Sequence, residues 1–390
     1  MVSIPRTLAA IRALEGTVPI RAPAGLGRWM ARPSTLDEVA TVLRFAAERG
    51  RGIRAQGAGT KADWFTDVSE VDVTVSTGGL DTWHYEPGSS VVTVGAGLPV
   101  QVAQVRLSAY GLRLPLDPRS SGGTVGGVLA TDEAGPMEMR FGRPVDQLLG
   151  AWGVRRGGTI VGLGAADPTC GPADPASIEH HPDPADLRWL ATGVLVAAVL
   201  PVQSVPPASR YVSREVGSPL EITHFLSAIQ ACGVSPSAIE LDLPTPVGDR
   251  IGRGGSLTVL IEGSMVSATD RAGTLAEAFG PGARFSDVPP DGWGRYPWHS
   301  GDIAIRLDAP GDALAAVAYA MRETANAPLA VRGSLGAGIG FAAIPARTPI
   351  DSVRAIVQTA RDVLMSRGGD AAVLAAPAPR IVSQRRPESL

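Results

Sequence analysis

The chain has 390 residues, of which 44% are hydrophobic and 19% charged, with a formal net charge of −3. This composition is typical of a soluble globular protein large enough for two domains. It offers no basic surface for a nucleic acid, so we expect no nucleic acid partner. The two cysteines, Cys170 and Cys232, lie far apart, which argues against a disulfide framework, an iron–sulfur cluster or a zinc site.

The N-terminus and the longest apolar run bear on where the protein resides. Residues 1–14 contain arginines and no apolar core, so we expect no signal peptide. The run Leu190–Leu200 is too short to span a bilayer and predicts a buried strand. We therefore expect a cytoplasmic protein with no membrane span.

The first half of the chain alternates predicted helices and strands. A capping box at Thr35–Glu38 predicts a helix that ends at Gly50, and Pro99 to Gly111 bound a second helix. Runs of β-branched and other apolar residues predict strands at 53–55, 71–75, 91–94, 146–154, 159–161 and 194–199. Several prolines in 164–186 predict an irregular loop, and 201–207 reads as a linker.

The second half repeats the alternation. Ser218–Glu221 is a second capping box, and helices are predicted at 218–233, 269–279, 314–321 and 353–364. Strands are predicted at 238–243, 257–261, 303–307, 329–332, 339–343 and 371–374. This order predicts an α+β fold in which helices cover one face of a sheet. The tail, 375–390, is rich in proline and arginine and is expected to be disordered.

Two glycine-rich stretches stand out in the first half. The first glycine loop is Gly57-Ala58-Gly59-Thr60, and the second glycine stretch is Gly122 to Gly127. Glycine allows positive φ and close approach of a ligand to the backbone, and successive amides in such a turn suit an anion. Neither spacing is that of a Rossmann fingerprint or a P-loop. A tight turn could also account for either stretch alone, but two of them about sixty residues apart predict one ligand held at two points.

Together these stretches resemble the FAD-binding PCMH-type domain of the vanillyl-alcohol oxidase and p-cresol methylhydroxylase superfamily. The resemblance is greatest to the E subunits of bacterial glycolate oxidases. The segments that carry it are Arg32–Val39, Gly57–Lys61, Leu114–Pro118, Gly122–Ala130, Gly301–Leu307 and Gly368–Leu374. The resemblance implies a two-subdomain FAD-binding domain at 1–203 and an α+β cap domain at 204–374.

The resemblance also implies where FAD would bind. Neither glycine-rich stretch contains histidine or cysteine, so the FAD is expected to be noncovalent. The residues expected to contact it or to shape its site are Gln56, Gly57, Ala58, Gly59, Thr60, Pro115, Asp117, Gly122, Gly123, Thr124, Gly126, Gly127, Gly193 and Val194.

The chain departs from the family in two places. Asp132-Glu133-Ala134-Gly135 replaces an Asn-Ala-Ser-Gly-like run, and two carboxylates beside a pyrophosphate are expected to repel it. The segment 163–192 replaces the part that touches the flavin ring in relatives of the glycolate oxidase type.

Oxidation of a 2-hydroxy acid requires a base for the hydroxyl and a cation for the carboxylate. The candidates are His299, in an aromatic stretch, and Arg306 and Arg332, on predicted strands. Each also has an ordinary structural explanation, as an aromatic-stretch histidine or a paired strand arginine. His180-His181 lacks a third fixed ligand, so we expect no metal site.

The leading hypothesis is an FAD-dependent oxidoreductase subunit of the glycolate oxidase type. It would act on a 2-hydroxy acid beside flavoprotein and iron–sulfur partner subunits. The alternative is a degenerate, non-catalytic subunit that keeps the fold as an interaction module, and 163–192 is its main support. A freestanding oxidase of a sugar or alcohol would share the same fold.

Overall fold

The computed structural model describes residues 29–62, 64, 71–164, 192–245, 254–326 and 329–376. Cys170, the His180-His181 pair, nearly all of the irregular loop expected at 164–186 and the tail beyond 376 lie outside these ranges. Across the described ranges, no helix combines the length and apolar character needed to cross a bilayer.

The chain begins with a small parallel sheet and one helix. The sheet has the order β1 (Trp29–Ala31), β3 (Val73–Ser76), β2 (Ile53–Gln56), and helix α2 (Leu36–Glu48) packs on it through Val39 and Leu43. The Thr35 hydroxyl accepts a hydrogen bond from the amide of Glu38, and the Glu38 carboxylate accepts one from the amide of Ser34 at 2.8 Å. These reciprocal bonds start α2 where the capping box predicts it.

A five-stranded antiparallel sheet follows. Its order is β4 (Trp83–His84), β5 (Val91–Gly95), β9 (Val194–Pro201), β7 (Gly150–Val154), β8 (Ile160–Gly164). Helices α3 (Val100–Ser108) and α4 (Val125–Thr131) share a buried apolar cluster with this sheet. The remaining elements of this half are η1 (Thr77–Gly79), β6 (Leu112–Arg113), α5 (Glu138–Phe141), η2 (Pro144–Gln147) and β10 (Gln203–Ser204).

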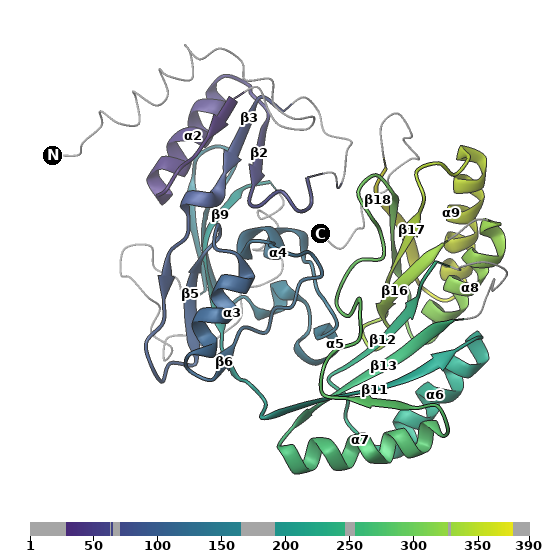
Figure 1. Ribbon diagram of the computed structural model, residues 1–390. Coiled ribbons are helices and arrows are strands. Elements are labelled where there is room, and N and C mark those ends of the chain that lie inside the picture. Colours follow the sequence, from purple (N-terminus) through teal and green to yellow (C-terminus); the bar gives the residue numbers. More distant parts are fainter. Residues whose placement is uncertain are drawn as a thin grey trace.

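The C-terminal half is one eight-stranded antiparallel sheet with helices on one face. Its order is β14 (Arg284–Ser286), β11 (Ala208–Val216), β13 (Gly255–Gly263), β12 (Ala238–Leu243), β16 (Ala330–Ser334), β17 (Ile339–Ile344), β15 (Ile303–Asp308), β18 (Asp370–Ala375). The helices are α6 (Pro219–Cys232), α7 (Met265–Phe279), α8 (Ala313–Ala325) and α9 (Ile350–Met365). Figure 1 shows these helices on the outer face, while α5 lies beside the inner face. The expected α+β fold, with a sheet covered on one face, is confirmed.

Two expectations differ from the structure. The linker expected at 201–207 contains β10, which pairs with β6, and β11 begins at Ala208, just after it. The second glycine stretch is only partly a loop, because its last residues form the first turn of α4.

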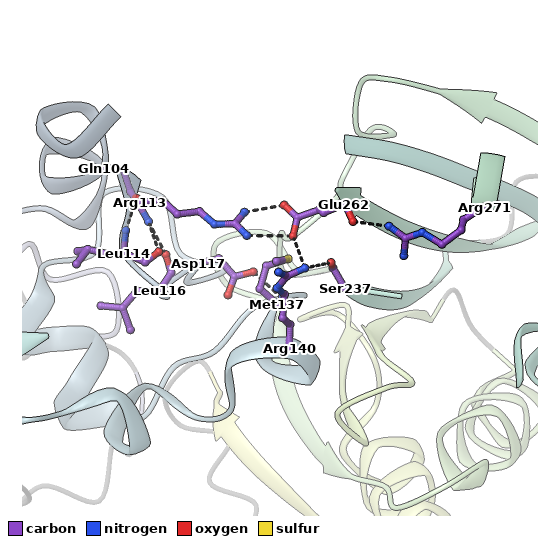
Figure 2. A network of polar contacts seen from close by, with 10 residues as sticks. All are labelled: Gln104, Arg113, Leu114, Leu116, Asp117, Met137, Arg140, Ser237, Glu262 and Arg271. Carbon is purple, nitrogen blue, oxygen red and sulfur yellow. Dashed lines mark hydrogen bonds and ion pairs between the residues drawn. The ribbon is translucent and has the colours of Figure 1, made fainter. Parts of the chain in front are cut away.

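Buried ion pairs connect the two halves. Arg113 of β6 donates to both carboxylate oxygens of Glu262 on β13, at 2.6 and 3.0 Å, and Arg140 reaches the same carboxylate at 3.3 Å. Figure 2 shows Arg113 and Arg140 converging on Glu262. Arg119 makes a second bidentate pair with Glu240 of β12, at 2.9 and 2.8 Å, and both side chains are at most 5% exposed. Because bidentate pairs fix orientation as well as distance, the inner face of the large sheet has a defined position against the N-terminal half.

Candidate functional site

A cavity of about 440 Å³ lies in the N-terminal half, where the two small sheets and α4 meet. Its wall comes from the end of β2, the first glycine loop, the cavity-facing side of α4 and the residues that precede and begin β9. The volume falls within the range of pockets that hold small molecules and cofactors.

The two glycine-rich stretches touch each other in this wall. A Cβ placed on Gly57 would overlap the hydroxyl of Thr124, so only glycine at position 57 lets the first glycine loop lie against the start of α4. Gly59 has a φ of +75°, in the left-handed region that favours glycine. The expectation that both stretches adjoin one ligand site therefore has a direct geometric counterpart.

The backbone amides of the two stretches are used differently. The amides of Gly57 to Thr60 donate to no acceptor among the described residues. In α4, by contrast, the amide of Val125 donates to Leu98 O, that of Gly126 to Ala96 O, and that of Gly127 to the Thr124 hydroxyl. The first glycine loop thus offers free donors to an anion, whereas the second supplies a hydroxyl and a surface without side chains.

The predicted cofactor residues divide into two groups. Gln56, Gly57, Ala58, Gly59, Thr60, Thr124, Gly126, Gly127 and Gly193 line the cavity. Pro115, Asp117, Gly122, Gly123 and Val194 do not.

Asp117 is partly buried and lies away from the wall of the large cavity. Its carboxylate accepts a hydrogen bond from the amide of Met137 at 2.7 Å. Burial raises the pKa of Asp117 to about 7, and the Met137 amide and Arg119 oppose that rise. Asp117 therefore holds the chain before α5 in place rather than facing a ligand in the large cavity.

Asp132 and Glu133, which were expected to repel a pyrophosphate, are both paired and lie outside the wall of the large cavity. Asp132 forms an ion pair with Arg143 and accepts from the amide of Val145 at 3.1 Å. Both carboxylates are at most 5% exposed, and neither lines the large cavity. Countercharges and hydrogen bonds therefore compensate both groups, which lie outside the large cavity's wall.

Glu133 is the centre of a buried network. Lys61 forms an ion pair with it, Ser120 donates to it through its amide at 2.7 Å and its hydroxyl at 2.6 Å, and the hydroxyl of Tyr296 donates at 2.9 Å. Lys61 directly follows the first glycine loop and lines the cavity. Burial and the nearby Glu133 raise the pKa of Tyr296, which therefore keeps its proton.

Sequence reasoning did not select Lys61, Trp64, Ala130, Thr131 or Arg156, which also line the large cavity. Ala130 and Thr131 could have been selected only from the helical spacing of α4, and this helix was not predicted from the sequence. Lys61 is the only lysine in the chain and adjoins the first glycine loop, and this was the available signal.

A second, smaller cavity of about 20 Å³ lies between the N-terminal half and the inner face of the large sheet. Trp64 and Thr131 line both cavities, so the two adjoin. The small cavity is also lined by Asp132, Glu133, Ala134, Glu138, Tyr296, Arg306, Ile339, Phe341 and Leu374.

The three predicted catalytic candidates lie in different environments. The side chain of His299 is 94% exposed and lines neither cavity. Arg332 pairs with Asp242 at 2.8 Å and also lines neither. Arg306 lines the small cavity, and its Nε donates to Asp308 at 2.9 Å. Of the three, only Arg306 lines one of these two cavities.

The sequence of residues 28–164 matches the FAD binding domain family. The chain also resembles two curated proteins over part of its length. It is distantly homologous to the D-lactate dehydrogenase of Archaeoglobus fulgidus, with 26% identity over 151 residues, or 38% of this chain and 34% of that protein. The mitochondrial D-2-hydroxyglutarate dehydrogenase of Bos taurus is 26% identical over 144 residues, or 36% of this chain and 26% of that protein. The match thus spans about a third or less of these curated relatives.

Solved structures share the fold over most of the chain. An alkyldihydroxyacetonephosphate synthase has a TM-score of 0.62 at 14% identity, covering 87% of this chain and 71% of that one. The BBE-like 1 protein of Physcomitrella patens also has a TM-score of 0.62 at 14% identity, covering 93% of this chain and 85% of its own. At these identities the likeness concerns the fold.

The residues present fit FAD in the large cavity. The free amides of Gly57 to Thr60 suit its diphosphate, and Gly126 and Gly127 of α4 line the same cavity without side chains of their own. Among the described residues that line the cavity there is no histidine or cysteine for a covalent bond to flavin.

Proposed function

We propose that the protein is an FAD-dependent oxidoreductase subunit of the glycolate oxidase type, which oxidises the CH–OH group of a 2-hydroxy acid. The observation that carries the proposal is the run of free amides at Gly57 to Thr60, held against Thr124 in a domain of an FAD-binding family. The names of both curated relatives point to 2-hydroxy acids as substrates.

The chain's own residues would bind FAD noncovalently and orient it. The amides of the first glycine loop and the Thr124 hydroxyl would hold the diphosphate, while Lys61 keeps that loop fixed to Glu133. When bound, FAD supplies a two-electron acceptor for the substrate.

Electrons must then leave for an acceptor that this chain does not hold. An iron–sulfur cluster is commonly bound by four cysteines, and the 390 residues contain two. This composition supports the partner subunits expected of the glycolate oxidase type, a second flavoprotein and an iron–sulfur protein.

A non-catalytic interaction module remains the second candidate, and one observation favours it. The small cavity is bordered by stacked aromatic rings: Tyr296 and Trp298 have centroids 4.2 Å apart, and Trp64 packs edge-on against Tyr296 at 5.7 Å. These rings join Trp64 of the N-terminal half to the C-terminal half, and such packing is also expected of a site that is kept for structure alone.

The test is the retention of flavin by the purified protein. We expect the wild-type protein, incubated with FAD and desalted, to keep a visible flavin absorption band. Replacing Ala130, an exposed α4 residue in the cavity wall, by tryptophan should abolish the band. The matched control is A47W, on an exposed position of α2 away from both cavities, and it should retain FAD.

Far-UV circular dichroism and the thermal unfolding temperature should be the same for both variants. A wild-type protein that retains no flavin would refute the proposal, as would undiminished retention by A130W. Retained flavin that no 2-hydroxy acid bleaches under anaerobic conditions would favour the interaction module.

A further inference from the structure

We propose that Glu138 and Arg306 form the substrate subsite of this chain, a site for a small 2-hydroxy acid whose carboxylate binds Arg306 and whose hydroxyl faces Glu138. The inference rests on the proposed function and adds to it a proton acceptor that neither the glycine-rich stretches nor the family resemblance identifies.

The first argument is the position of the two side chains. Glu138 belongs to α5 in the N-terminal half and Arg306 to β15 in the large sheet, and both line the small cavity. The cavity shares Trp64 and Thr131 with the large cavity, so a molecule bound there would lie next to the FAD site.

The second argument is that both groups have capacity left for a ligand. No hydrogen bond or ion pair joins the Glu138 carboxyl to any described residue, although its side chain is partly buried. Arg306 is oriented by the bond from its Nε to Asp308, while its two terminal nitrogens donate to no described acceptor. By comparison, Glu133, Asp132 and Tyr296 in the same wall are fully engaged.

The third argument is the character of the remaining wall. Ile339, Phe341 and Leu374 contribute apolar surface, and Phe341 lies directly across from Arg306 on the neighbouring strand. An apolar wall lowers the local dielectric, which strengthens a guanidinium–carboxylate contact. A volume of about 20 Å³ holds one or two water molecules. A 2-hydroxy acid of even two carbons has five non-hydrogen atoms, so part of it would extend past Trp64 and Thr131 into the adjoining large cavity.

The ionisation of Glu138 suits a proton acceptor. Burial, together with the neighbouring Asp132, raises its pKa to about 7 against the opposing effect of Arg306, Arg143 and Arg119. A base is most effective when its pKa lies near the working pH. In the reaction the substrate O–H bond breaks and its proton passes to the Glu138 carboxylate. The hydrogen on C2 leaves with its electron pair to the two-electron acceptor of the proposed function, and the product is a 2-oxo acid.

The experiment measures acid binding and flavin reduction separately. Oxalate, a two-carbon acid without an oxidisable C–H bond, is titrated calorimetrically into the FAD-loaded protein. Flavin bleaching by glycolate or D-lactate is followed anaerobically by stopped flow. The variants are E138Q, R306M and R306K, and the controls are E323Q and R354M, at exposed positions on α8 and α9.

We expect R306M to weaken oxalate binding at least 10-fold and R306K to recover part of it, because the charged contact is the main attraction. We expect E138Q to slow flavin bleaching at least 100-fold while oxalate binding stays within threefold or tightens. All variants should retain FAD as the wild-type protein does.

Failure of the subsite proposal can be distinguished from failure of the proposed function. A wild-type protein that retains FAD but binds no oxalate would refute the subsite, and so would an E138Q variant that bleaches at the wild-type rate. A protein that retains no FAD would refute the proposed function and the proton transfer with it.

Discussion

Asp117 provides a prediction whose sign and size follow from its burial. Its carboxyl is buried, and burial raises its pKa from 3.8 to about 7. Between these pH values the folded chain binds a proton that the unfolded chain has already released. Stability therefore falls as pH rises through this window and is constant above it. A pKa difference of about 3 between the two states corresponds to about 4 kcal/mol at most.

The perturbation is D117N, which cannot ionise and keeps an oxygen to accept from the amide of Met137. Relative to the wild-type protein, D117N should gain about 2–3 kcal/mol in free energy of unfolding between pH 5 and pH 8. Any pH-independent effect of the asparagine side chain on stability is the same at both pH values, so it cancels when the two differences from wild type are subtracted.

The assay is urea unfolding followed by tryptophan fluorescence at pH 5 and pH 8, at one ionic strength and in one FAD state. The control is D81N, at an exposed position between η1 and β4, which should show the same difference from wild type at both pH values. If D117N also differs from wild type equally at both pH values, Asp117 does not change its proton affinity on folding and the reasoning is wrong.

Two further predictions concern packing between and within the halves. E240Q leaves the Arg119 guanidinium buried without its countercharge and should lower the free energy of unfolding by about 3–5 kcal/mol. E215Q removes a charge from an exposed ion pair and should change the free energy of unfolding by less than about 1 kcal/mol. G126A places a Cβ 2.9 Å from a carbonyl oxygen just after β5 and should cost about 1–3 kcal/mol, whereas G157A meets no atom within 4 Å. Thermal unfolding by circular dichroism distinguishes each pair, and equal effects within a pair would contradict the packing described.

Local signals predicted much of the fold. The capping boxes at Thr35 and Ser218 start α2 and α6. In each, the side chain of the capping residue lies within hydrogen-bonding distance of the backbone amide three residues later in the chain. Strand β11 was harder to predict, because its fully buried residues, Ala208, Val212 and Val216, recur every four residues as on a helix. Pairing with β13 and β14 determines its conformation, and those partners lie about 40 to 75 residues away.

The second glycine stretch shows the same limit at the site. Val125-Gly-Gly-Val has low intrinsic helix propensity, so a loop was the expected structure. It forms the first turn of α4 because its amides bond to Ala96 and Leu98, and because Gly126 fits tightly against Ala96. Which of the two stretches keeps its amides free depends on these distant carbonyls, and the spacing of glycines carries no information about them.

The charges near the site could not be assigned from neighbouring residues either. Asp132 and Glu133 appear in sequence as two uncompensated carboxylates after a glycine-rich stretch. Their partners come from 11 residues away at Arg143, 72 at Lys61 and 163 at Tyr296. An estimate of repulsion from sequence counts the charges that are adjacent in the chain and omits those that the fold supplies.

These distant partners also connect the part of the chain that matches the FAD binding family to the C-terminal half. The FAD binding family matches residues 28–164, yet the large cavity needs Gly193, and the five-stranded sheet needs β9 between β5 and β7. Lys61, next to the free amides, is held through Glu133 to Tyr296 of the C-terminal half. The position of Lys61 therefore depends on that of the large sheet, which Arg119 and Glu240 help to fix. A family match that ends at residue 164 leaves out Tyr296, although the fold of two solved structures extends over 87% and 93% of the chain at 14% identity.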